Sequence, residues 1–178
     1  MKGVIFVELI NYLEESGGAL FAEEVIEAAK LPNAAAYSAV GTYPSAQALR
    51  MVEIASERTG TPSEELCTAF GRWLFERFTV RYPDIVGRYD DAETMLEHVG
   101  SHIHREVVVL YPDAVPPQVT GRREGDALVV DYRSSRPLAH IAYGLIAGCL
   151  AHFNDPRTVR WNDRSDPRQA SFRIAMEK

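Results

Sequence analysis

The stretch from Asp90 to Leu110 constrains the fold more than any other, because its apolar residues recur at steps of three and four. This spacing gathers them on one face of an α-helix. Asp90 and Asp91 precede the apolar residues as N-capping carboxylates, and Pro112 follows the last of them. The sequence therefore predicts one amphipathic helix, with an apolar stripe formed by Met95, Leu96, Val99, Ile103, Val107 and Leu110.

Two histidines lie in this helix and differ in their neighbours. Residues three and four apart share a helical face, so His102 lies beside the charged Glu106 and is expected to be solvated. His104 lies instead beside Gly100 and Ser101, which are expected to leave a gap for a flat ligand. A neutral imidazole is a common ligand of iron. The alternative is a core histidine that is hydrogen-bonded to a backbone carbonyl.

A second polar motif, Tyr132-x-Ser134-x-Arg136, follows a predicted β-hairpin. At strand spacing the three side chains would point the same way. A guanidinium and two hydroxyls on one face suit a pair of carboxylates better than they suit an apolar core. The alternative is the end of a strand with an ordinary surface arginine before Pro137.

These motifs belong to a set of features that occur in a fixed order. The set comprises Met1-Lys2-Gly3-Val4-Ile5-Phe6, His104, Pro116-Pro117, Tyr132-x-Ser134-x-Arg136 and Gly144-Leu145-Ile146-x-Gly148. Together the features resemble the heme nitric oxide/oxygen binding (H-NOX) domains, which include the sensor domain of soluble guanylate cyclase. The resemblance extends essentially from one end of the chain to the other.

The resemblance implies a b-type heme between an N-terminal helical part and helices that pack on an antiparallel sheet. His104 would be the proximal ligand of the heme iron. The heme propionates would be held by Tyr132, Ser134 and Arg136, and Pro117 would press on the macrocycle and distort it. Such a domain senses a gas and is not an enzyme. Its expected partner is a signalling protein, either a histidine kinase or a cyclic-di-GMP enzyme (a diguanylate cyclase or phosphodiesterase).

The resemblance also bears on which gas is bound. O2 on ferrous heme is held best by a hydrogen-bond donor, whereas NO and CO bind well without one. Oxygen-binding members use a tyrosine, a tryptophan and an asparagine, and this chain has Ile141, Leu9 and Leu74 at the matching places. Ile5 and Leu145 are expected to complete the apolar pocket wall. The resemblance therefore implies binding of NO and CO but not of O2.

The remaining sequence predicts a single α+β domain over residues 1–178 with an antiparallel sheet. Predicted helices cover residues 2–15, 20–29, 45–55, 91–110 and 137–153. A further helix is predicted to begin at residues 61–64, where a capping residue and a proline open it. Predicted strands cover 118–123, 127–132, 159–161 and 171–176, with a turn at 163–167 between the last two.

Composition narrows the possible functions. A net charge of -6 without any Lys/Arg-rich run argues against nucleic acid and anionic membranes as partners. The chain starts without an apolar run that could cross a bilayer, and its two cysteines lie far apart, so we expect a cytoplasmic protein. No Cys or His follows Phe153, so the zinc site of some bacterial H-NOX domains is expected to be absent.

Two other classes of function are possible from the sequence. In an enzyme, His104 would act as a general base and Arg136 would hold an anion, but no nucleophile elbow, phosphate-binding glycine loop, HExxH or paired-carboxylate motif supports this. A cofactor-free protein-interaction module would retain the same scaffold and apolar cleft. Colour distinguishes these possibilities, because only a heme protein shows a Soret band.

Overall fold

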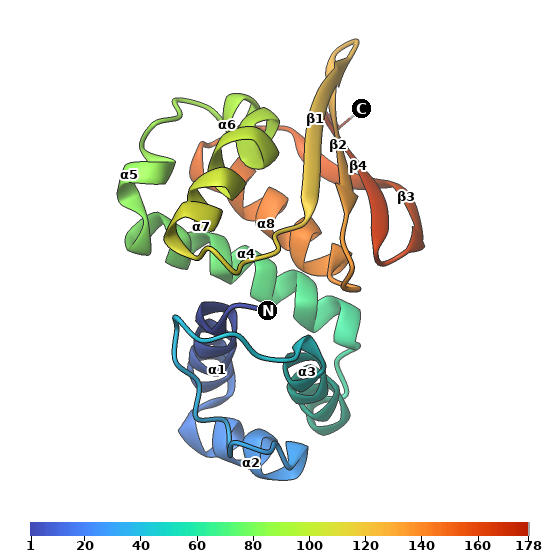
Figure 1. Cartoon of the computed structure of the whole chain (residues 1–178). Coiled ribbons are helices and arrows are strands. Elements are labelled where there is room, and N and C mark those ends of the chain that lie inside the picture. Colours follow the sequence, from blue (N-terminus) through green and yellow to red (C-terminus); the bar gives the residue numbers. More distant parts are fainter. Residues whose placement is uncertain (178) are drawn as a thin grey trace.

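The computed structural model describes residues 1–177, and its elements form two groups on either side of one long helix (Figure 1). The first group is an N-terminal helical lobe that comprises α1 (Gly3–Gly17), α2 (Ala19–Ala29) and α3 (Ser45–Thr59). α1 ends at Gly18 and α3 at Gly60, both with positive φ, a conformation that glycine adopts without strain. The predicted helices agree with these bounds to within a few residues.

The long helix α4 (Ser63–Arg81) packs along α8 (Ala139–His152) at very close range. A Cβ atom added at Gly144 would lie 2.1 Å from the carbonyl oxygen of Thr68, so only glycine fits there. Each helix starts one or two residues later than predicted. Pro62 and not Thr61 occupies the N-cap of α4, and it has no side chain that could accept a capping hydrogen bond.

The second group contains a four-stranded antiparallel sheet of order β1-β2-β4-β3, against which α6 (Ala92–His98) and α8 pack. Its strands are β1 (Gln118–Glu124), β2 (Ala127–Arg133), β3 (Thr158–Asp166) and β4 (Gln169–Ala175). The predicted first hairpin is confirmed. The predicted turn at 163–167 is wrong in its extent, because β3 continues through two irregularities in register to Asp166 and the chain turns at Pro167.

The helix predicted over 91–110 is interrupted in the structure. It consists of α6 (Ala92–His98), a π-helical turn η1 (Val99–Ile103) and α7 (His104–Leu110). Asp91 caps α6 as predicted and accepts a hydrogen bond from the Thr94 backbone N–H at 2.7 Å. A short helix that was not predicted, α5 (Pro83–Val86), precedes α6.

The gap predicted beside Gly100 is also wrong. A Cβ atom at Gly100 would lie 2.2 Å from the carbonyl oxygen of Val119 in β1. The backbone of the sheet therefore fills this space, and Gly100 serves close contact between helix and strand. Gly121 makes the reciprocal contact, since its Cβ would lie 2.9 Å from the Cα of Glu97.

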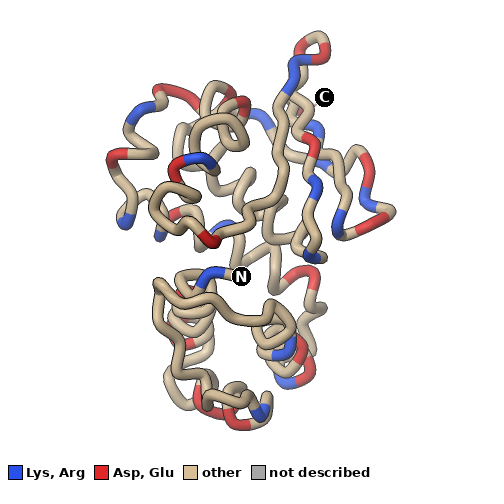
Figure 2. Tube along the Cα trace, in the orientation of Figure 1, with Lys and Arg blue, Asp and Glu red and all other residues tan. Residues whose placement is uncertain are grey.

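Positive and negative residues are scattered over both groups of elements in the described chain (Figure 2). Several of them form ion pairs that join different elements. Glu93 on α6 forms ion pairs with Arg123 of β1 and with Arg157, which lies just before β3. These ion pairs connect α6 to both edges of the sheet. Within residues 1–177, no helix has the length and apolar character that a membrane crossing requires.

Candidate functional site

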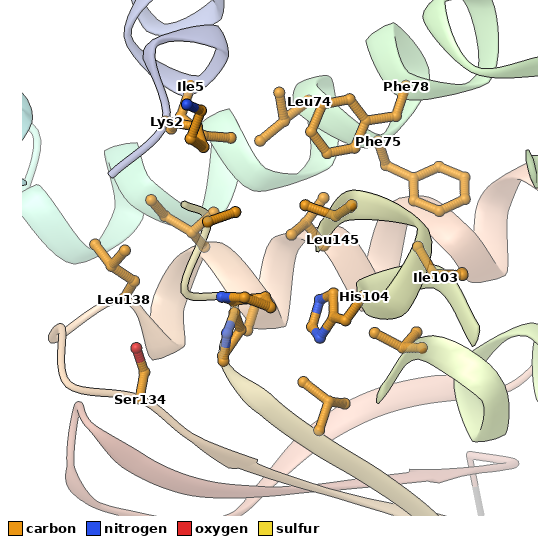
Figure 3. A pocket seen from close by; sticks show the side chains of 18 of the residues that line it. Lys2, Ile5, Leu74, Phe75, Phe78, Ile103, His104, Ser134, Leu138 and Leu145 are labelled. Atoms are coloured by element: carbon orange, nitrogen blue, oxygen red, sulfur yellow. The ribbon is translucent and has the colours of Figure 1, made fainter. Parts of the chain in front are cut away.

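A cavity of about 450 Å³ lies where α1, α4, α7, α8 and the sheet meet, and its walls are almost entirely apolar. This volume is in the range typical of small-molecule and cofactor sites. Figure 3 shows Ile5, Leu74 and Phe78 on one side of the cavity and His104 and Ser134 on the other. All of the predicted site residues except Leu9 line it: Ile5, Leu74, His104, Pro117, Tyr132, Ser134, Arg136, Ile141 and Leu145.

Leu9 requires a correction. It is only 3% exposed and packs in the core of the N-terminal helical lobe, outside the set of residues that line the cavity. Ile5, one turn earlier on α1, reaches the cavity instead. Helical spacing alone could not separate the two positions, since residues four apart share a face.

His104 is the first residue of α7, directly after the π-helical turn. Its Nδ1 atom is buried and makes no hydrogen bond of good geometry in the part of the chain that the structure describes, and the backbone carbonyl of Pro117 is the acceptor near the ring. A buried polar atom without a partner is costly, and it becomes satisfied when a ligand supplies the missing bond. His102, in contrast, is exposed and stacks on His98 at 4.7 Å between ring centroids.

Burial also affects the protonation of His104. It lowers the pKa of the imidazole, while the nearby backbone carbonyl of Pro117 acts in the opposite direction. The cavity therefore favours the neutral ring, which is the form that binds a metal. Within residues 1–177, no group of three or more His, Cys, Asp or Glu side chains is placed to hold a metal ion.

Tyr132, Ser134 and Arg136 converge on one end of the cavity, although not by strand alternation as predicted. β2 ends at Arg133, so Ser134 and Arg136 lie in the loop before α8. The backbone N–H of Arg136 donates to the Ser134 hydroxyl at 3.1 Å, and its guanidinium donates to the Val115 carbonyl at 2.9 Å. Tyr132 is 5% exposed, and burial raises the pKa of its phenol.

Charged groups of both signs, Lys2, Asp113 and Arg136, also line the cavity. The nearby Arg136 and Lys2 add to burial in lowering the pKa of the Met1 amino group. The sequence predicts no separate role for Lys2. Its partners, Val40, Thr42 and Asp113, lie 38 to 111 residues away in the chain, so no local pattern could reveal them.

The part of the cavity wall that α4 and α8 provide includes the hydrocarbon side chains of Leu74, Ile141 and Leu145. Two polar residues on α8 do not line the cavity. The Tyr143 hydroxyl donates to the Val159 carbonyl at 2.8 Å, and the His140 ring lies 3.8 Å from the Glu64 carboxylate. The phenols of Tyr82 and Tyr111 do line it, at the end where α7 finishes, and their hydroxyls lie 3.3 Å apart.

The arrangement fits a flat, mostly apolar macrocycle that carries carboxylates at one edge. The apolar walls would cover its faces, the neutral imidazole of His104 offers a nitrogen from one side, and the loop with Ser134 and Arg136 offers donors for anions. These are the features that the heme of an H-NOX domain requires.

Comparison with known proteins supports this fit. The chain matches the family model described as haem-NO-binding over residues 2–160. An H-NOX protein from Shewanella woodyi, bound to IWP-051 in the Fe(II)CO state, is 30% identical, with a TM-score of 0.83 over 99% of this chain and 95% of that one. The unliganded Fe(II) H-NOX protein from K. algicida is 27% identical, with a TM-score of 0.88 over 100% of this chain and 97% of that one.

The H-NOX protein from S. oneidensis in the Fe(II)NO state has a TM-score of 0.90 at 23% identity, with both chains covered completely. A comparison with curated proteins gave no match. The family match covers most of the sequence, and the fold agrees with it over the whole described chain. The chain therefore belongs to the haem-NO-binding (H-NOX) family of heme-binding gas-sensor domains.

Proposed function

We propose that this protein senses NO, and also binds CO, at a b-type heme held by His104, and that it excludes O2. The observation that carries the proposal is the buried Nδ1 of His104, which lacks a well-formed hydrogen bond, in an apolar cavity that Arg136 also lines. The test is titration of the heme-free protein with heme. A saturable Soret band at one heme per chain is expected, and a chain that stays colourless would contradict the proposal.

In this proposal the chain's residues hold the cofactor from two directions. His104 binds the iron, while Tyr132, Ser134 and Arg136 bind the propionates. Pro117 lines the cavity close to His104, which supports a role in pressing on the macrocycle. When bound, the heme supplies the iron to which a diatomic gas binds.

Replacing Arg136 with alanine is expected to weaken heme retention about tenfold or more, because a charge-assisted pair contributes about 1.5–3 kcal/mol. The measurement is the rate of heme transfer to an excess of apomyoglobin, followed in the Soret region. Arg133→Ala is the matched control, since Arg133 is exposed and does not line the cavity. Equal transfer rates in the two variants would remove the proposed role of Arg136.

The exclusion of O2 rests on the hydrocarbon wall of Leu74, Ile141 and Leu145. Ile141→Tyr is expected to give the ferrous protein measurable O2 binding, because the new hydroxyl supplies the missing donor. The measurement is an O2 titration of the ferrous variant beside Ile141→Phe, which has the same ring without the hydroxyl. If neither variant binds O2, position 141 does not face the gas.

Signalling completes the proposal. The relatives bind NO and CO according to their descriptions, and we propose that gas binding here shifts the domain between two states that a protein partner distinguishes. The partner would be a histidine kinase or a cyclic-di-GMP enzyme, with no catalysis by the domain itself. The unpaired Cys67 and Cys149 suit the reducing cytoplasm in which we place it.

A further inference from the structure

The segment that follows α7 is tied to elements on the other side of the cavity. Asp113 accepts hydrogen bonds from the Lys2 ammonium at 2.8 Å and from the Thr42 hydroxyl. The same ammonium lies 5.2 Å from the centre of the Tyr111 ring, whose hydroxyl pairs with that of Tyr82 at the end of α4. We call these five residues the clasp.

The clasp joins the helix of His104 to the N-terminal helical lobe. Lys2 immediately precedes α1, and Thr42 lies in the loop before α3. Tyr111 directly follows the last residue of α7, and Asp113 lies two residues further on. The Lys2 side chain is only 10% exposed and also donates to the Val40 carbonyl, so it is held firmly on the side of the lobe.

Apart from the clasp, α7 has few contacts with other elements, and one of them is the partly exposed ion pair between Glu106 and Arg88. None of its residues is buried, and Val109 is 79% exposed. Its main packing partner is η1. The preceding turns are fixed instead, because the glycine contacts at Gly100 and Gly121 lock η1 and α6 to β1.

The π-helical turn lies between the fixed part and α7. π-helices are rare, and single π-helical turns inside α-helices often occur at functional sites. A change in η1 would reorient α7 and His104 while α6 stays on the sheet. The clasp then resists that movement at the far end of α7.

We propose that the clasp restrains α7 in the arrangement in which His104 can bind iron, and that it couples release of His104 to the N-terminal helical lobe. The inference rests on the proposed heme ligand. A contact made in one state and lost in the other biases the equilibrium between them by its own free energy. Breaking the clasp should therefore favour release.

Two substitutions test the clasp because they change local charge in opposite directions. Lys2→Met removes a positive charge near the expected propionates, and Asp113→Asn removes a negative one. A purely electrostatic effect on heme would have opposite signs in the two variants. Loss of the clasp predicts the same sign in both. Lys2→Arg retains the positive charge, so it should keep the clasp and behave nearly as the parent protein does. Glu53→Gln, which removes an exposed ion pair with Arg50 on α3, is the control.

The first readout is hydrogen exchange of α7 amides in the heme-free protein. Exchange should be about twofold to fivefold faster in both variants, as expected for loss of a partly exposed ion pair and its hydrogen bonds. The second readout is the absorption spectrum of the heme-loaded protein after NO is added. The fraction of protein in which the imidazole no longer binds iron should rise in both variants. Unchanged exchange in both variants, or spectral shifts of opposite sign, would overturn the clasp.

The two readouts separate this inference from the proposed function. If the parent protein binds no heme, the proposed function fails, and with it the role of the clasp in releasing His104. Exchange would then still report whether the clasp restrains α7. If the parent binds heme through His104 and both variants behave as the control does, the clasp fails while the proposed function stands.

Discussion

The variant His104→Ala is expected to lose stable heme binding, with no Soret band after desalting. The imidazole is the only histidine side chain that lines the cavity among the described residues, so no nearby histidine replaces it. Free imidazole fits the space that the substitution opens and should restore the band. The measurement is the heme-to-protein ratio with and without imidazole. Heme affinity should fall by more than about 100-fold, because loss of the iron ligand itself should exceed the roughly 10–100-fold typical of outer-shell groups.

His102→Ala is the matched control, two residues away in the same segment. His102 is exposed and stacks on His98, so its loss should leave the spectrum unchanged. The opposite pattern, with heme lost in His102→Ala and retained in His104→Ala, would show that His102 is the iron ligand.

Gly144→Ala should destabilise the fold by about 1–3 kcal/mol or more, the cost typical of overpacking a core. The added methyl group would lie 2.1 Å from the Thr68 carbonyl and would force α8 away from α4. Helix propensity alone predicts the opposite sign, since alanine favours a helix over glycine by about 1 kcal/mol. The measurement is the midpoint of urea unfolding.

Ala151→Ser is the control for this substitution. It adds one heavy atom on the exposed side of α8, so the change in free energy of unfolding should be within about 0.5 kcal/mol. A stabilised Gly144→Ala protein would show that α4 and α8 can separate without cost. In that case the close helix contact would not be what fixes Leu74, Ile141 and Leu145 around the cavity.

Local patterns in the sequence predicted most of the elements. The glycines after α1 and α3, the Asp91 cap and the alternation from Leu128 to Tyr132 each act over a few residues, so they can be recognised without the fold. The neighbours of His102 one turn away also indicated a solvated side chain, and the structure leaves His102 exposed. His104 as the iron ligand stays a prediction. The resemblance to H-NOX domains supplied the ordered set of cavity residues that no single motif could supply.

Features that depend on distant contacts were missed or misinterpreted. Apolar spacing could not show the π-helical turn, because the same residues remain on one side when a single turn widens. Gly100 was interpreted as space for a ligand, but it accommodates the backbone at Val119. The direction of Leu9 and the pairing of Lys2 with Asp113 depend on how the lobe meets the rest of the chain.

The most direct test of the central claim is one series of absorption spectra from the heme-loaded ferrous protein, taken without oxygen, then in air, then with NO. The account predicts a Soret band that stays in place when air is admitted, before slow oxidation, and shifts when NO is added. A polypeptide that does not take up heme, or a reversible shift of the Soret band in air, would contradict it.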